Sequence, residues 1–128
     1  TKNEERRTSN EERRTPDAPM LTDADIQKMA DLIAERFQPE KIILFGSYAK
    51  GTATEDSDVD LVVVTRDGRT DVRDQAARMQ VAVWDFPVGK DILVRTPQQL
   101  EYERSLSWTV FRTALDHGKV LYSYARSA

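Results

Sequence analysis

The amino-acid sequence predicts an α/β domain in which a small mixed β-sheet is flanked by helices. Apolar runs at 41–45, 58–64 and 91–94 have the length and composition of strands, and segments with helical apolar spacing lie before and between them. A chain of 128 residues suffices for one hydrophobic core and not for two. We therefore expect a single domain over residues 20–128, preceded by a charged N-terminal tail at 1–19.

The N-terminal tail differs in composition from the rest of the chain. The six residues Asn-Glu-Glu-Arg-Arg-Thr occur at 3–8 and again at 10–15, and no apolar side chain precedes Ala18. A segment with so little to bury is predicted to be flexible.

The first helix and the first strand follow from local signals. Thr22, with Asp25 three residues later, resembles a capping box that begins a helix. Apolar residues then recur at helical spacing, and Pro39 ends the helix: Ile26, Met29, Ala30, Ile33 and Phe37. The run 41–45 is the first expected strand.

The middle of the chain predicts a central strand and a second long helix. Apolar residues within 58–64 point to both sides of a strand, which indicates cover on both faces of the sheet. A second helical pattern ends near 85–87 and comprises Val72, Ala76, Met79 and Val83. The run 91–94 is the third expected strand.

The C-terminal part begins with a strong helix signal. Thr96 is followed by Pro97 at the first helical position and by Gln99 three residues after the threonine. A further helix is predicted over 106–117, and 119–122 is expected to add a short edge strand.

Composition excludes several classes of function. The net charge of −3 disfavours a nucleic acid as direct partner, since a broad phosphate footprint needs a basic surplus. The absence of cysteine removes disulfides and thiolate metal sites. No apolar stretch is long enough to cross a bilayer, and the N-terminus has no apolar signal core. We therefore expect a cytoplasmic protein without a membrane partner.

A glycine–serine pair after the first strand is typical of a phosphate-binding turn. Gly46 permits a tight turn and lets phosphate oxygens come close to the backbone. Ser47 begins the next short helix, where its amide and hydroxyl can donate to a phosphate. Lys50 can neutralise phosphate charge, although a solvated helix lysine fits its position equally well.

Two aspartates at the start of the second strand predict a magnesium site. Side chains alternate along a strand, so Asp58 and Asp60 project to the same side. Magnesium is held by one or two carboxylates together with waters and substrate phosphates. In the alternative interpretation Asp58 caps a turn and Asp60 is solvated, but residues 55–57 already supply turn-forming side chains.

Asp91 is the third candidate carboxylate. If the third strand lies beside the second, Asp91 joins the aspartate pair, where it can bind metal or accept the proton of an attacking hydroxyl. The alternative is an ion pair with Lys90 or Arg95 at the end of the strand.

The glycine turn and the aspartate pair together resemble the signature of the DNA polymerase β-like nucleotidyltransferases. Gly-Ser is separated by ten residues from Asp-x-Asp, within residues 43–51 and 57–61. The resemblance covers roughly residues 22–122, and the chain is most similar to the minimal nucleotidyltransferases (MNT). It implies a nucleotidyltransferase fold.

The resemblance also assigns roles to the site residues. It implies that Asp58 and Asp60 bind two magnesium ions, that Asp91 is the family's third carboxylate, and that Gly46 and Ser47 hold the triphosphate of ATP. Lys50 stands where this family usually has arginine. The replacement keeps the charge but loses bidentate phosphate binding.

Members of the minimal group often act as antitoxins beside HEPN-domain ribonuclease toxins, so the resemblance implies a HEPN toxin as partner. The implied reaction transfers AMP from ATP to a tyrosine hydroxyl of that toxin. A partner that carries the acceptor gives Trp108 or Phe86 an interface role. Two alternatives stay open: a small molecule or nucleic-acid end as acceptor, and a non-catalytic antitoxin that neutralises its partner by contact.

Overall fold

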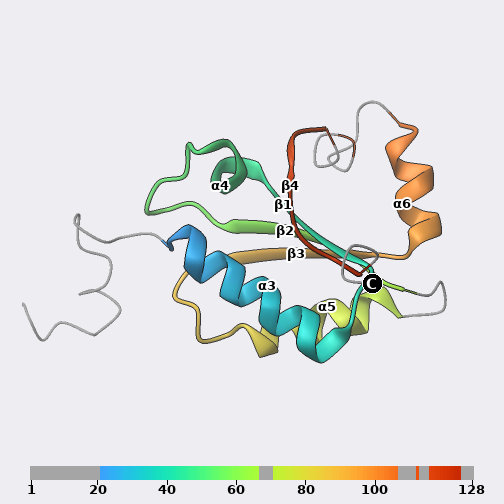
Figure 1. Cartoon of the computed structure of the whole chain (residues 1–128), viewed down its shortest axis with the longest axis horizontal. Helices are drawn as coiled ribbons and strands as arrows, with labels where there is room; N and C mark the ends of the chain where they lie inside the picture. The colour runs from blue at the N-terminus through green and yellow to red at the C-terminus, as the bar shows by residue number, and fades with distance from the viewer. Residues whose placement is uncertain (1–20, 67–70, 107–111, 113–115, 125–128) are drawn as a thin grey trace, which may run out of the picture.

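The structure is a computed structural model that describes residues 21–66, 71–106, 112 and 116–124 (Figure 1). The predicted N-terminal tail and most of the predicted helix at 106–117 lie outside the described residues. The other predicted helices and strands lie within them.

The described strands form one four-stranded mixed sheet. They are β1 (Lys41–Phe45), β2 (Val59–Val64), β3 (Lys90–Arg95) and β4 (Lys119–Ser123), in the order β3-β2-β1-β4. β1 is antiparallel to β2 and to β4, whereas β2 and β3 are parallel. The expected small mixed sheet and its C-terminal edge strand are therefore confirmed.

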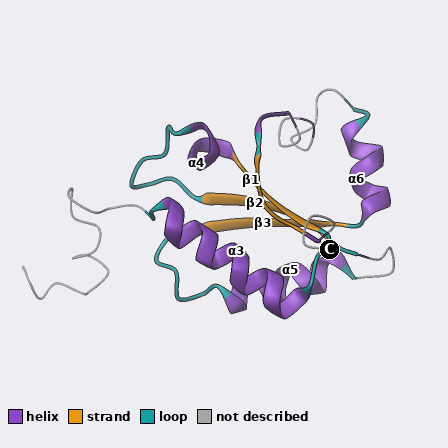
Figure 2. Ribbon diagram, in the orientation of Figure 1, coloured by secondary structure: helices purple, strands orange, loops and turns teal. Residues whose placement is uncertain are grey.

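Helices cover both faces of the sheet. α3 (Asp23–Phe37) and α5 (Val72–Ala82) lie together on one face, α6 (Pro97–Arg104) lies toward the other, and the short α4 (Gly46–Lys50) follows β1 (Figures 1 and 2). Among the described residues, no helix combines the length and the apolar character needed to cross a membrane.

The central strand β2 contributes to two apolar clusters, one on each face. Val59, Leu61 and Val63 are buried with α3 and α5 residues. Val62 and Val64 are buried on the other face, where the half-buried Leu100 of α6 packs against them. This burial confirms the prediction of a central strand covered on both sides.

The predicted start of the first helix is also confirmed. The Thr22 hydroxyl accepts a hydrogen bond from the Asp25 amide at 3.1 Å, and the Asp25 carboxylate accepts one from the Thr22 amide at 3.2 Å. The helix ends at Phe37, and Gln38 adopts a left-handed conformation with φ of 50° ahead of Pro39.

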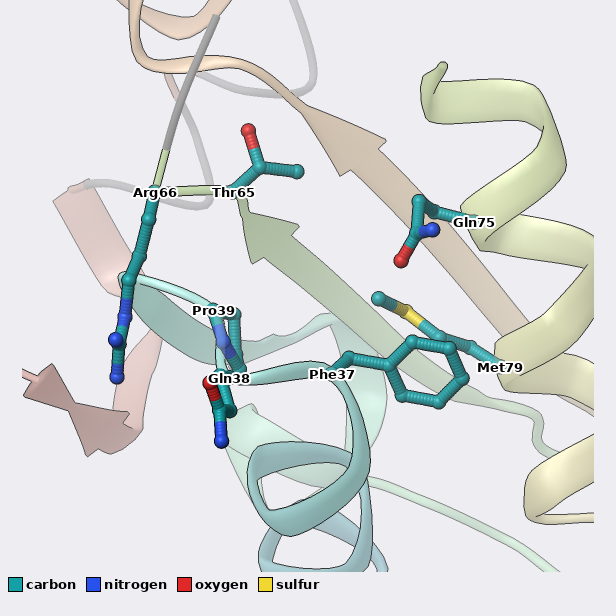
Figure 3. Close-up of a pocket in the computed structure, with 7 residues that line it drawn as sticks. All are labelled: Phe37, Gln38, Pro39, Thr65, Arg66, Gln75 and Met79. Carbon is teal, nitrogen blue, oxygen red and sulfur yellow. The ribbon is translucent and has the colours of Figure 1, made fainter. Parts of the chain in front are cut away.

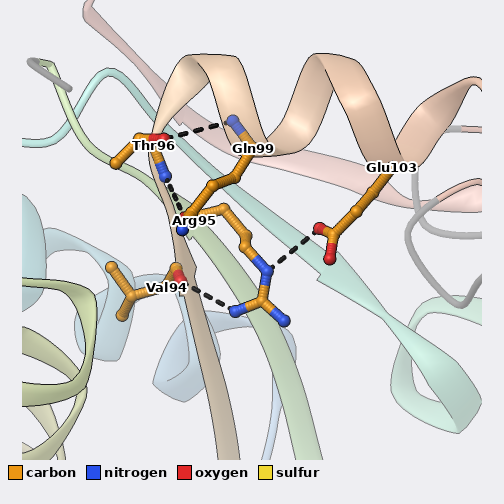
Figure 4. A network of polar contacts seen from close by, with 5 residues as sticks. All are labelled: Val94, Arg95, Thr96, Gln99 and Glu103. Atoms are coloured by element: carbon orange, nitrogen blue, oxygen red, sulfur yellow. Dashed lines mark hydrogen bonds and ion pairs between the residues drawn. The ribbon is translucent and has the colours of Figure 1, made fainter.

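A polar network fixes α6 to the end of β3 (Figure 4). The Thr96 hydroxyl accepts from the Gln99 amide at 3.1 Å, and the Gln99 side chain accepts from the Thr96 amide at 3.0 Å. Arg95 Nε donates to Glu103 Oε1 at 3.0 Å, and Arg95 Nη1 donates to the carbonyl of Val94 at 2.9 Å. The predicted capping box is therefore present.

Replacing the capping threonine should destabilise the fold. We expect Thr96→Ala to lower the free energy of unfolding by about 1–2 kcal/mol, because the Gln99 amide loses its acceptor at a buried helix start. Urea denaturation measures the change. Gln98→Ala, at an exposed position in the same helix, is the control and should cost less than about 0.5 kcal/mol. Equal losses in the two variants would contradict the capping role.

Candidate active site

The chain turns sharply at Gly46, between β1 and α4. Gly46 has a φ of +74°, a left-handed conformation that side chains rarely adopt. A Cβ on Gly46 would lie 3.1 Å from Cγ of Asp60 and closer still to its Oδ2. Glycine at this position therefore permits both the left-handed turn and the close approach of the Asp60 carboxylate.

Asp60 and Asp91 occupy neighbouring positions on adjacent strands. Asp60 is paired with Phe45 at the end of β1 on one side and with Asp91 in β3 on the other. Because side chains alternate along strands, Asp60 and Asp91 lie on the face that carries Val62, opposite the face buried by α3 and α5. The strand pairing thus brings together two carboxylates that are 31 positions apart in the sequence.

Asp58 lies just before the second strand. We predicted it inside the strand, but β2 begins at Val59, so that detail was wrong. The bond between the Val59 amide and the Gly89 carbonyl, at 2.9 Å, links this point to the residue before β3. Asp58 is exposed, and its carboxylate lies close to Gly89.

The preceding turn does not depend on Asp58. The Thr54 amide donates to Ser57 Oγ at 2.8 Å, and the Ser57 amide donates to the Thr54 carbonyl at 3.0 Å. Asp58 makes no hydrogen bond to any other residue that the structure describes. Its carboxylate therefore has no capping role in this turn.

The charges of the two neighbouring carboxylates act on Asp60. Burial, followed by the negative charges of Asp91 and Asp58, raises the pKa of the Asp60 carboxyl above its ordinary value. The site therefore concentrates negative charge around a half-buried carboxylate. A bound cation would offset this repulsion.

The neighbouring basic side chains are engaged elsewhere. Lys90 Nζ donates to the Phe86 carbonyl at 2.7 Å, and Arg95 pairs with Glu103 at 3.0 Å. Burial lowers the pKa of Lys90, while the Asp85 carboxylate acts in the opposite direction. The alternative in which Asp91 forms an ion pair with Lys90 or Arg95 does not agree with these contacts.

The carboxylates fit a metal that completes its coordination with substrate. In the described part of the chain, no three histidine, cysteine, aspartate or glutamate side chains form a ready-made metal cluster. Magnesium usually takes one or two carboxylates and fills its octahedron with waters and phosphate oxygens. Asp58 and Asp60 suit that mode, because both lie at the first end of β2. Asp60 is beside Gly46 there, and Asp58 is beside Gly89.

The structure places Ser47 and Lys50 on the short helix that follows Gly46. Ser47 is half-buried in the first turn, and its hydroxyl bonds to no other residue in the described ranges. Lys50 is exposed in the last turn of this five-residue helix, about 6 Å along the axis from Gly46 at 1.5 Å per residue. Ser47 and Lys50 therefore follow the turn that lies against the Asp60 carboxylate.

Sequence patterns did not indicate that Gly89 and Lys90 lie beside these carboxylates. Gly89 has no positive φ and no motif around it, so its contact with Asp58 appears only when the strands pair. Lys90 belongs to the same stretch and holds the loop before β3 through its contact with Phe86.

Two cavities lie away from the carboxylates. One of about 240 Å³ is lined by residues at the end of α3, at the end of β2 and on α5 (Figure 3): Phe37, Gln38, Pro39, Thr65, Arg66, Gln75 and Met79. The other, of about 280 Å³, lies between α3 and α5. Since Thr65 follows the last residue of β2, the first cavity is at the opposite end of this strand from Asp60.

The aromatic residues divide between core and surface. Phe86 is half-buried against the main apolar cluster, which leaves it little free surface for an interface. Trp84 is 77% exposed at the end of α5, beside the equally exposed Val81. Trp108 lies outside the described residues.

Comparison with known proteins agrees with this geometry. The family described as "Nucleotidyltransferase domain" matches residues 26–120, a range that includes the glycine turn and all three carboxylates. A Methanocaldococcus jannaschii protein, provisionally named protein adenylyltransferase MJ0604, is 32% identical over 83 residues. The matched region is 65% of this chain and 78% of that protein.

Solved structures share the fold. The crystal structure of a provisionally named nucleotidyltransferase from Sulfolobus solfataricus superposes with a TM-score of 0.54 at 18% identity, covering 79% of each chain. A chain in the crystal structure of a toxin–antitoxin with AMP-PNP gives a TM-score of 0.50 at 22% identity, covering 79% of this chain and 76% of that one.

Proposed function

The chain belongs to the nucleotidyltransferase domain family, and we propose that it uses magnesium and ATP to transfer AMP to a hydroxyl of a partner protein. The observation that carries the proposal is the position of Asp60. Its carboxylate lies against the Gly46 turn, and its backbone is paired with Asp91 in the parallel register of β2 and β3. A triphosphate held at the turn would thereby meet the carboxylates that bind its metal.

The reaction needs no nucleophile from this chain. The acceptor oxygen attacks the α-phosphorus of ATP, a new P–O bond forms, and the bond to the β-phosphate breaks. Pyrophosphate leaves, and the proton of the acceptor hydroxyl must be taken up by a base. Catalysis of such a transfer consists mainly of positioning and charge stabilisation.

Each site residue has a role in this scheme. The backbone at Gly46 and the hydroxyl of Ser47 would hold the phosphates, and exposed Lys50 would neutralise part of their charge. Asp58 and Asp60 would hold magnesium, which when bound lowers the pKa of the acceptor hydroxyl and stabilises the leaving pyrophosphate.

Asp91 would orient the acceptor and receive its proton. Asp91 is exposed on the strand next to Asp60 and pairs with neither Lys90 nor Arg95, so its carboxylate can accept a hydrogen bond. Because Asp91 is exposed beside the half-buried Asp60, an acceptor hydroxyl from solvent can reach its carboxylate.

We further propose that the acceptor is a tyrosine of a HEPN-type toxin and that the chain acts as its antitoxin. Two observations on similar proteins support this: one relative is provisionally named a protein adenylyltransferase, and a toxin–antitoxin structure with AMP-PNP shares the fold.

The proposal is tested by labelling. The purified chain is incubated with Mg²⁺ and each of the four α-labelled nucleoside triphosphates, together with a purified HEPN toxin. We expect label from ATP on the toxin and none with the Asp58→Asn, Asp60→Asn double variant. A toxin Tyr→Phe variant identifies the acceptor.

Other outcomes would replace the proposal with a definite alternative. Label on added RNA or on a small molecule would move the acceptor to that class. If the double variant bound and inhibited the toxin as well as the natural sequence does, neutralisation by contact would explain the antitoxin activity.

A further inference from the structure

We infer that Gly89 is a positioning residue for the Asp58 carboxylate, and hence for the metal that the proposed function requires. Gly89 is the last residue before β3 and lies beside Asp58 on the adjacent chain segment. A Cβ at Gly89 would be 2.9 Å from Cγ of Asp58 and closer still to its Oδ1. Only glycine leaves room for the carboxylate in this orientation.

The loop that carries Gly89 is fixed from several sides. The Gly89 carbonyl accepts from the Val59 amide at 2.9 Å, and the next carbonyl, of Lys90, accepts from Gln80 Nε2 of α5 at 2.9 Å. Lys90 Nζ reaches back to the Phe86 carbonyl at 2.7 Å. An added methyl group at Gly89 therefore cannot be accommodated by a shift of the loop.

The Asp58 side chain is the part that would move. Asp58 is exposed, and no other described residue forms a hydrogen bond with its carboxylate. Rotation of this carboxylate would relieve the clash at little cost in stability. The rotated carboxylate, however, would leave its present place beside Gly89, and with it the arrangement of Asp58 and Asp60 that we propose binds magnesium.

Gly89 thus differs from Gly46, although a Cβ at either would strike an aspartate. Gly46 has a φ of +74°, so its replacement strains the backbone, whereas Gly89 has no such constraint. Asp60 is half-buried in a strand that is paired on both sides, so its carboxylate has less room to rotate than that of the exposed Asp58. Replacement of Gly89 should therefore affect metal binding without a loss of folding stability.

The test compares Gly89→Ala, Asp58→Asn and Gly51→Ala with the natural sequence. The affinity for Mn²⁺ in the presence of a non-hydrolysable ATP analogue is measured by electron paramagnetic resonance, and the melting temperature Tm is measured without metal. For Gly89→Ala we expect affinity to fall by about 10–100-fold, as for other supporting residues of metal sites. Its Tm without metal should be unchanged or slightly raised.

Gly51→Ala is the matched control. Gly51 has a φ of +79°, but a Cβ there would meet nothing within 4 Å. This variant should lose Tm through backbone strain and keep its affinity for Mn²⁺.

The outcomes separate this inference from the proposed function on which it rests. If Asp58→Asn weakens Mn²⁺ binding and Gly89→Ala does not, the role of Gly89 is wrong and the metal site stands. If the natural sequence binds no Mn²⁺ with the analogue, both the metal site and the role of Gly89 are wrong.

Discussion

Asp60→Asn should strongly reduce the rate of nucleotidyl transfer while it stabilises the metal-free protein. Asp60 is the only one of the three carboxylates that is half-buried, and it lies between the Gly46 turn and Asp91. The charge stabilisation supplied by a bound metal is worth several kcal/mol, and each 1.4 kcal/mol is a factor of ten, so the transfer rate should fall by roughly a thousandfold. The rate is measured with α-labelled ATP and a fixed concentration of acceptor.

The gain in stability follows from the raised pKa of Asp60. Burial and the charges of Asp91 and Asp58 make the folded protein bind a proton at Asp60 more readily than the unfolded chain does. This contribution to stability is fully present below the ordinary pKa of an aspartate and is lost as the pH rises through the raised pKa of Asp60. At neutral pH the ionised Asp60 therefore destabilises the fold, and asparagine removes that penalty.

The melting temperature in EDTA measures this second effect. We expect Asp60→Asn to melt above the natural sequence at pH 7 and the difference to shrink as the pH falls toward the ordinary aspartate range. Glu35→Gln, at an exposed position of α3 on the other face of the sheet, is the control and should change neither property. Loss of activity together with loss of stability in Asp60→Asn would instead indicate a structural role for this carboxylate.

Local sequence signals predicted most of the fold. Both capping boxes, at Thr22 and Thr96, form the hydrogen bonds expected from their spacing. The two-sided apolar pattern of β2 identified it as central. These features depend on contacts between neighbours in sequence or on the burial of a whole strand, and both leave a pattern that can be read along the chain.

The details of the site depend on which strands pair and in which register. Strand pairing leaves no local pattern of apolar or capping residues along the sequence. The sequence predicted that Asp91 would join Asp58 and Asp60 if the strands were neighbours, and the parallel register pairs Asp91 with Asp60. That register also brings the loop residue Gly89 to Asp58, a contact across 31 positions. The start of β2 at Val59 was missed for the same reason, since Gly89 supplies the carbonyl that the Val59 amide needs.

Gly46→Ala should lower both stability and activity, unlike a substitution at Gly89. A side chain at Gly46 would hold an unfavourable left-handed φ of +74° and would strike the Asp60 carboxylate. The backbone strain alone costs about 1–2 kcal/mol. Because Asp60 is half-buried, the clash must move either its carboxylate or the Gly46 turn, which we propose holds the phosphates.

Comparison with Gly51→Ala separates the two causes. Gly51 shares the left-handed backbone, with a φ of +79°, but a Cβ there meets open space. Both variants should therefore lose about 1–2 kcal/mol in urea denaturation from strain. Only Gly46→Ala should also transfer label more slowly. We expect its rate to fall by at least about 100-fold if the Gly46 turn and Asp60 act as a preorganised unit. Equal transfer rates in the two variants would mean that the contact between Gly46 and Asp60 has no part in catalysis.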